Sequence, residues 1–143
     1  MYRVLIPVDE NTDRALLAAE AVESLPNATE EVQAVLLNVF EEFEVSGEGG
    51  PVKSEDVWDE ENYPESVDAV EEHLESAGVS VTRRREHGDT AEQIIAVADE
   101  IDADSVVMSG RKRSPTGKVL FGSVTQSVML SAECPVMVSL SER

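Results

Sequence analysis

Three apolar segments without regular alternation limit the folds open to this chain more than any other feature of its sequence. They cover residues 2–8, 32–39 and 105–108, and such segments are typical of parallel strands buried on both faces of a sheet. Residues 79–86 do alternate, which predicts a strand at the sheet edge with one wetter face. Residues 135–138 are apolar throughout and supply a fifth predicted strand.

Helical periodicity fills the intervals between these strands. The candidate N-caps are Asn11, Thr12 or Asp13 for a helix to about residue 25, Asn62 for a helix with Pro64 in its first turn, Thr90 with Gln93, and Ser123 with Gln126. Helices that alternate with parallel strands predict an open α/β sheet with right-handed crossovers and helices on both faces. With 143 residues, the chain is expected to form a single domain over residues 1–143.

The carboxyl edge of such a sheet is where a ligand is expected. Ligands of open α/β sheets bind beyond the strand ends, at the point where the strand order reverses. Asp9 follows the first predicted strand and Gly110 follows the fourth. If these strands are neighbours, both residues face one crevice, and Asp9 is the one acid expected there.

The segment from residue 105 to residue 132 carries no acid, although acids make up 30 of the 143 residues. A window of this length should hold ~6 acids by chance, and it instead holds Arg111, Lys112, Arg113 and Lys118. Helix N-termini present free N–H groups, and glycines let the backbone approach an anion closely. The segment therefore indicates a phosphate cradle; the alternative is an ordinary strand–helix connection whose basic residues balance nearby acids.

The net charge of −19 argues against binding to nucleic acid through a general basic face. Hydrophobic residues make up 41% of the chain, which argues against disorder, and no run of 18 apolar residues predicts a membrane span. An acidic, lysine-poor chain that still forms a core is typical of a protein adapted to molar salt, which we take as a hypothesis; a merely acidic mesophile protein is the alternative. The lone Cys134 and a start that does not fit a signal peptide predict a cytoplasmic protein with a buried thiol.

The chain also carries glycine, arginine and acidic segments whose spacing bears on function. Six residues separate Gly110 from Gly117 and Lys118, whereas a Walker loop has four, and no G-x-G-x-x-G follows the first strand. Residues 83–85 are three arginines, which we expect at an exposed strand end rather than in a nucleic-acid patch. Residues 40–63 carry nine acids and predict a solvated loop; a divalent-cation site is the less favoured alternative.

Over nearly all of its length the chain resembles the universal stress protein family. The matching segments are Ile6-Pro7-Val8-Asp9, Leu37-Asn38-Val39, His87-Gly88-Asp89, Val106-Val107-Met108-Ser109-Gly110, Phe121-Gly122-Ser123-Val124-Thr125 and Cys134-Pro135-Val136-Met137-Val138. The resemblance implies five parallel strands in the order 3-2-1-4-5. That order would place Asp9 and Gly110 on the same crevice.

In ATP-binding members of this family the motif is Gly, two residues, Gly, nine residues, then Gly-Ser or Gly-Thr. Gly110 matches the first glycine and Gly122-Ser123 the final pair. Arg113 stands at the middle glycine, and eight residues instead of nine separate it from Gly122. The resemblance implies bound ATP or AMP, with or without Mg²⁺. It further implies that Asp9 lies near the adenine or ribose and that the Val39 main chain contacts the adenine. The implied nucleotide contacts are Pro7, Val8, Asp9, Val39, Gly110, Arg111, Arg113, Gly122, Ser123, Val124 and Thr125.

Two functions from different classes remain open at this point. The favoured one is a nucleotide-binding stress regulator without efficient turnover, because no candidate general base stands beside the loop. An enzyme is therefore not expected, and slow ATPase or phosphotransferase activity is a weaker option. The alternative function is a dimeric stress-related interaction protein with a vestigial nucleotide site.

The fifth predicted strand also bears on assembly. An apolar strand at a sheet edge invites pairing with another chain, and the family resemblance points the same way. We therefore expect a homodimer in which the two fifth strands pair antiparallel about a two-fold axis. The strand residues are Pro135, Val136, Met137 and Val138; coverage of this edge by the C-terminal tail is the alternative.

Overall fold

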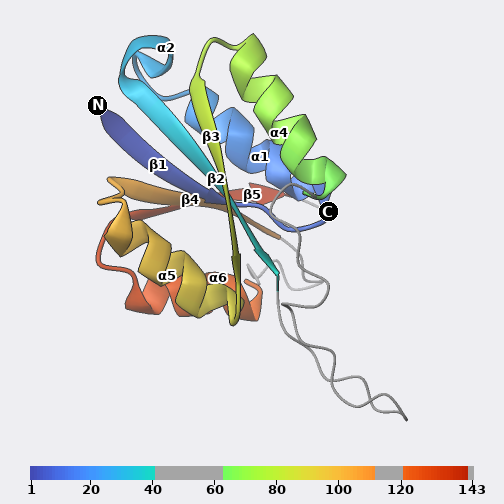
Figure 1. Cartoon of the computed structure of the whole chain (residues 1–143), viewed down its shortest axis with the longest axis vertical. Coiled ribbons are helices and arrows are strands. Elements are labelled where there is room, and N and C mark those ends of the chain that lie inside the picture. Colours follow the sequence, from blue (N-terminus) through green and yellow to red (C-terminus); the bar gives the residue numbers. More distant parts are fainter. Residues whose placement is uncertain (41–62, 112–120, 142–143) are drawn as a thin grey trace.

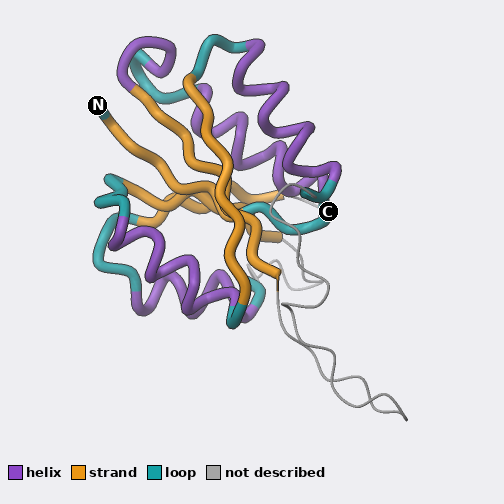
Figure 2. Tube along the Cα trace, viewed as in Figure 1, coloured by secondary structure: helices purple, strands orange, loops and turns teal. Residues whose placement is uncertain are grey.

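The computed structural model describes residues 1–40, 63–111 and 121–141. In chain order the elements are β1 (Tyr2–Pro7), α1 (Thr12–Glu23), α2 (Ala28–Glu31), β2 (Val32–Phe40), α4 (Glu65–Ser76), β3 (Ser80–His87), α5 (Thr90–Glu100), β4 (Ser105–Arg111), α6 (Ser123–Ser131) and β5 (Val136–Ser141). Figures 1 and 2 show the strands as one twisted sheet between two groups of helices. The interior of the predicted acidic loop, residues 41–62, lies outside the described residues.

All five strands are parallel, and their order across the sheet is β3-β2-β1-β4-β5. This order confirms the expected open α/β fold and places β3 and β5 at the two edges. The chain order reverses between β1 and β4, which pair directly through Val4 with Ser105 and Leu5 with Val106. The carboxyl ends of β1 and β4 therefore flank the position where ligands of such sheets bind.

The helices before β3 begin close to the predicted positions. Asn11 is the N-cap of α1, and its side-chain oxygen accepts a hydrogen bond from the Arg14 N–H at 2.9 Å. The cap is thus the first of the three predicted candidates. Pro64 is itself the N-cap of α4, so the expected proline inside the first turn is wrong, and Asn62 lies outside the described residues. The four-residue α2 was not predicted; it follows Asn27, which adopts a left-handed φ of 56°.

The predicted capping boxes of the last two helices are wrong by one residue. The N-cap of α5 is Asp89, whose carboxylate accepts from the Glu92 N–H at 3.0 Å, so Thr90 lies within the first turn. The N-cap of α6 is Gly122, and Ser123 is the first helical residue. An aspartate accepts strongly at a helix start, which explains why it displaces the neighbouring threonine as cap.

The three arginines of β3 are half-buried, and Arg83 and Arg84 form ion pairs, so the expected exposed strand end is wrong. Arg83 donates to Glu71 at 2.7 and 3.0 Å and to Asp68 at 2.7 Å, both on α4. The Arg83 hydrogen bonds hold the pKa of Glu71 below its ordinary value, and the same bonds raise the pKa of Arg83. These ion pairs fix α4 to the edge strand.

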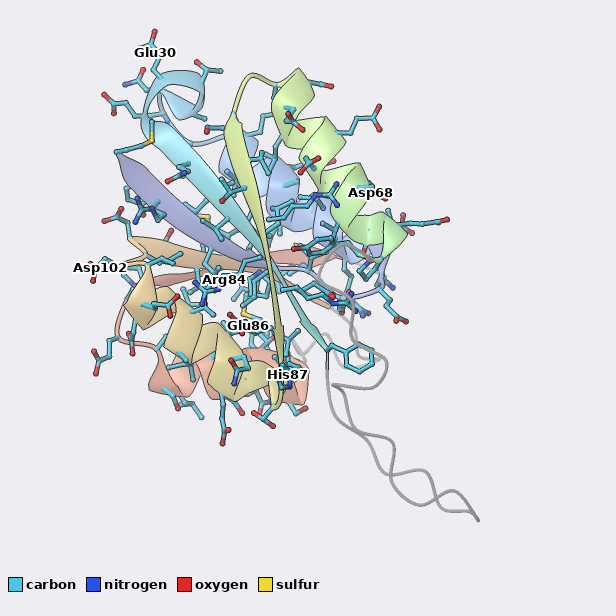
Figure 3. All side chains as sticks on the ribbon, in the orientation of Figure 1. Glu30, Asp68, Arg84, Glu86, His87 and Asp102 are labelled. Carbon is cyan, nitrogen blue, oxygen red and sulfur yellow. The ribbon has the colours of Figure 1, made fainter. Side chains whose placement is uncertain are left out.

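The next arginine points to the opposite face of the sheet, because side chains alternate along a strand. Arg84 pairs with Glu86 at 2.8 Å on its own strand and with Glu100 at the end of α5. The Arg84 hydrogen bond lowers the pKa of Glu100. Figure 3 labels Arg84 and Glu86 along β3 and Asp68 on α4, so the edge strand binds a helix on each side of the sheet.

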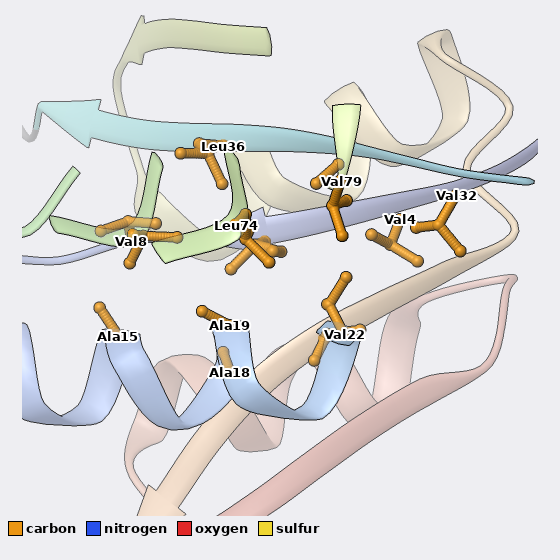
Figure 4. Close-up of a cluster of buried hydrophobic side chains, with 14 of the residues drawn as sticks. Val4, Val8, Ala15, Ala18, Ala19, Val22, Val32, Leu36, Leu74 and Val79 are labelled. Carbon is orange, nitrogen blue, oxygen red and sulfur yellow. The ribbon is translucent and has the colours of Figure 1, made fainter. Parts of the chain in front are cut away.

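Two apolar cores lie on the two faces of the sheet, as the unalternating strands predicted. Adjacent strand residues point to opposite cores: Val4 and Ile6 pack under α1 and α4, whereas Leu5 packs against α5 and α6. Figure 4 shows the first core, where small residues of α1 approach the sheet. Its labelled members are Val4, Val8, Ala15, Ala18, Ala19, Val22, Val32, Leu36, Leu74 and Val79.

Candidate functional site

A large cleft opens at the carboxyl edge of the sheet, where the strand order reverses. Its volume is about 1480 Å³. Its walls come from the ends of β1, β2 and β4 and from the first turns of α1, α4, α5 and α6. Its described lining comprises residues 7–12, 14–15, 37–40, 63–66, 108–110 and 121–125, with Arg85, Thr90 and Ile94.

The cleft brings together nine of the residues that the sequence singled out. These are Pro7, Val8, Asp9, Val39, Gly110, Gly122, Ser123, Val124 and Thr125. Arg111 ends β4, so its main chain is next to the cleft residue Gly110, but its side chain lies outside the description. Arg113 also lies outside the described residues. The prediction that Asp9 and Gly110, at the ends of β1 and β4, share one crevice is therefore confirmed.

Asp9 lies in the cleft, two residues after the end of β1. Its carboxylate accepts two hydrogen bonds, from the Asn11 N–H at 2.8 Å and from Arg14 Nη2 at 3.2 Å. The side chain remains 64% exposed. An ionised carboxylate offers about four acceptor positions, so Asp9 retains room to accept a hydrogen bond from a ligand.

The main chain around Asp9 is held by two buried polar side chains that sequence reasoning missed. Asn38 Nδ2 donates to the Val8 carbonyl at 3.0 Å, and the Ser66 hydroxyl donates to the Asp9 carbonyl. The Val8 N–H donates to the Leu37 carbonyl at 2.8 Å. The turn that carries Asp9 is thus fastened to β2 and to the start of α4.

The first turn of α6 forms the opposite wall of the cleft. Its N-cap, Gly122, provides no side-chain hydrogen bond to the helix, and the Gln126 N–H is bonded to the Gly122 carbonyl at 3.0 Å. The three N–H groups before Gln126 have no partner within an α-helix and carry its positive end. They belong to Ser123, Val124 and Thr125, so this wall suits an anion.

The two glycines of the site differ in what surrounds them. A Cβ at Gly122 would meet no described heavy atom within 4 Å, so this position faces open space. A Cβ at Gly110 would lie 3.2 Å from side-chain carbons of Leu140, Phe121 and Val138. Gly110 is therefore required for packing against β5, a role the sequence did not suggest.

Charged and aromatic residues that the sequence did not assign to the site complete the cleft. Arg85 lines it, with its guanidinium 5.4 Å from the centre of the Phe40 ring and 6.0 Å from that of Tyr63. Glu10 and Glu65 also line it, so the expectation that Asp9 is the one acid present is wrong. Cation–π contact of this kind orients an arginine fork.

The described part of the chain shows neither a metal-ligand cluster nor a membrane-spanning helix. Within residues 1–40, 63–111 and 121–141, no three His, Cys, Asp or Glu side chains gather in a way that would hold a metal ion. In the same ranges no helix is long and apolar enough to cross a bilayer.

Comparison with known proteins gives one consistent result. Residues 1–139 match the model of the Universal stress protein family. A universal stress protein of Mycolicibacterium smegmatis is 39% identical over 72 residues, which are 50% of this chain and 55% of that protein. A universal stress protein of Methanocaldococcus jannaschii is 26% identical over 137 residues, which are 95% of this chain and 80% of that protein.

Solved structures of similar fold cover almost the whole chain. A universal stress protein from Archaeoglobus fulgidus has a TM-score of 0.70 at 27% identity, covering 96% of this chain and 98% of that one. The universal stress protein from the same organism in complex with dAMP has a TM-score of 0.65 at 22% identity, covering 96% and 97%. A universal stress protein in complex with cAMP has a TM-score of 0.65 at 15% identity, covering 96% and 94%.

Proposed function

The chain belongs to the universal stress protein family, and we propose that it acts in the stress response by binding an adenine nucleotide, AMP or ATP, in the cleft. Relatives of the same fold form complexes with dAMP and cAMP, and both ligands contain adenine and a phosphate group. The observation that carries the proposal is the first turn of α6, which has no side-chain cap and faces open space at Gly122.

The proposed orientation of the nucleotide follows from the charge of the cleft walls. The phosphates lie at the start of α6, where the N–H groups of Ser123 and Val124 point outward and the helix dipole favours an anion. We propose that Arg111 and Arg113, which precede this helix in the sequence, add positive charge at this end. The ribose and base then extend toward Asp9 and the Val39 main chain at the ends of β1 and β2.

We further propose that binding proceeds without efficient turnover. Hydrolysis or phosphoryl transfer needs a group that positions and deprotonates the attacking nucleophile. The Asp9 carboxylate already accepts from Asn11 and Arg14, which favours an anchoring role over proton abstraction. If ATP is the ligand, Mg²⁺ would be held mainly by the phosphates, as is usual for this ion.

Native mass spectrometry of the purified full chain tests the proposal directly. The expected result is a co-purified mass of an adenine nucleotide, followed by saturable binding of AMP and ATP in calorimetry on the stripped protein. ATP incubated with the protein should remain largely intact over many binding lifetimes. Absence of both co-purified nucleotide and calorimetric binding would overturn the proposed function.

One further observation favours association of two copies of the chain. β5 is an edge strand, and Met137 and Leu140 on it are each 39% exposed. Exposed apolar residues on an unpaired edge favour addition of another strand. We propose that two chains pair through β5, which would also serve the alternative function of a dimeric interaction protein.

A further inference from the structure

One hydroxyl group links the start of α4 to a residue that lines the cleft. Ser66 is 1% exposed and lies in the first turn of α4, yet its side chain does not cap that helix. Its hydroxyl donates to the main-chain carbonyl of Asp9, 57 positions earlier in the chain. A polar side chain at such a buried position needs a partner, and the carbonyl of Asp9 supplies it.

The contact fixes more than the carbonyl that accepts it. The direction of the Asp9 side chain follows the main chain of the same residue, and the carboxylate completes the turn by accepting from the Asn11 N–H. Val8, the preceding residue, is held from the other side by Asn38. With Ser66 removed, the Asp9 carbonyl loses a donor, and one of the two clamps on this turn disappears.

The position of α4 does not depend on Ser66. Val67, Val70 and Leu74 of this helix are fully buried. Arg83 of β3 also forms ion pairs with Asp68 and Glu71 of the helix. Loss of one hydroxyl therefore leaves α4 docked and loosens the Asp9 turn alone. This separation makes a role in positioning measurable apart from a role in stability.

We propose that Ser66 is a positioning residue of the nucleotide site, which acts by holding the Asp9 main chain so that the carboxylate points at the ligand. The inference rests on the proposed function, since it assigns to Ser66 a part in the affinity for adenine nucleotides. A serine that merely satisfies α4 packing would affect stability and leave affinity unchanged.

The test is calorimetric titration of AMP into the parent, Ser66→Ala, Asp9→Ala and the double variant. Ser66→Ala should weaken AMP binding about ten-fold, equivalent to about 1.4 kcal/mol. The double variant should bind no more weakly than Asp9→Ala alone, because Ser66 acts through Asp9. Ser66→Thr, which keeps the hydroxyl, should recover affinity.

Ser105→Ala is the matched control. Ser105 is 2% exposed at the start of β4, and its hydroxyl has no hydrogen-bond partner among the described residues, so its removal should leave AMP affinity unchanged. Parental affinity in Ser66→Ala, or additive losses in the double variant, would refute the positioning role. A parent that binds no AMP would instead refute the proposed function, and the role of Ser66 would fall with it.

Discussion

Replacement of Gly122 by valine separates binding from folding more sharply than any other change at the cleft. Gly122 has φ −68° and ψ 162°, a conformation open to every residue type, and a Cβ there meets no described atom within 4 Å. The change therefore costs the protein only the lower preference of valine for an N-cap position, about 1 kcal/mol or less. For a chain of this length we expect a fall in Tm of roughly 4 °C.

The effect on the ligand should be much larger. A phosphate held at the start of α6 must come within hydrogen-bond distance of the Ser123 and Val124 N–H groups, and the valine methyls would occupy that space. Hydrogen bonds to a charged group contribute about 1.5–3 kcal/mol each. Loss of two of them corresponds to about 3–6 kcal/mol, so AMP and ATP affinity should fall at least about 100-fold.

Calorimetry for binding and thermal unfolding for stability, measured on the same samples, decide the outcome. Gly122→Ala should give an intermediate loss of affinity. Gly110→Ala is the opposite control, because its Cβ meets packed carbons at 3.2 Å, and it should destabilise the fold by about 1–3 kcal/mol. A folded Gly122→Val variant that binds AMP and ATP like the parent would show that the phosphates lie elsewhere.

Three further predictions concern Asp9, the edge of α4 and β5. Asp9→Ala should weaken AMP binding by about 1.5–3 kcal/mol. Unchanged affinity would mean that Asp9 does not bind the nucleotide and serves only its contacts with Asn11 and Arg14. Because Arg83 lowers the pKa of Glu71, their ion pair stabilises the fold fully above the ordinary glutamate pKa of about 4.3 and is lost as the pH falls through the lowered value. In urea denaturation, Glu71→Gln should therefore be less stable than the parent by about 0.2–1 kcal/mol at pH 7. This difference should shrink as the pH falls through the lowered pKa of Glu71, and a difference that persists in acid would contradict the ion pair. Met137→Glu should convert a dimer into a monomer in light scattering at molar KCl. Met137 is exposed, whereas a methyl group of Val138 packs beside Gly110, so the change at Met137 disturbs the fold less. A parent that is already monomeric would contradict pairing through β5.

The pattern of apolar residues was sufficient to predict the strands and the coverage of both sheet faces. Each residue of an inner strand is buried on one side or the other, so the sequence shows apolar runs without alternation. The strand order is different, since no local pattern encodes which strands are neighbours. It was expected from the family resemblance, and the pairing of β1 with both β2 and β4 confirms it.

The helix starts show why local motifs fail by one residue. At α5 both Asp89 and Thr90 can accept from the first turn, and the sequence motif does not say which of the two stands outside the helix. At α6 the cap is Gly122, which has no side chain, so the capping-box pattern indicates the serine that follows it. The short α2 has too few residues to display a helical period.

The candidate site was predicted where it depends on strand ends and missed where it depends on long-range contacts. Asp9 and Gly122 follow or precede regular elements, so their positions follow from the fold. Ser66 and Asn38 act on the residues 8 and 9 from distant segments, and no spacing rule links them. Both left a signal, because each is a polar residue inside an apolar stripe, Ser66 on α4 and Asn38 on β2.

The three consecutive arginines of β3 have a consequence for how this edge strand finds its alignment. A shift of β3 by one residue exchanges the faces of all its side chains. In one direction it would bring Arg84 to the acids of α4 and Arg85 to Glu100. The ion pairs are thus nearly degenerate between the two alignments. Discrimination must come from residues whose surroundings change on exchange, among them Val79 and Val81, which pack in the first core. Polar replacements there would leave the strand attached but ambiguous in register.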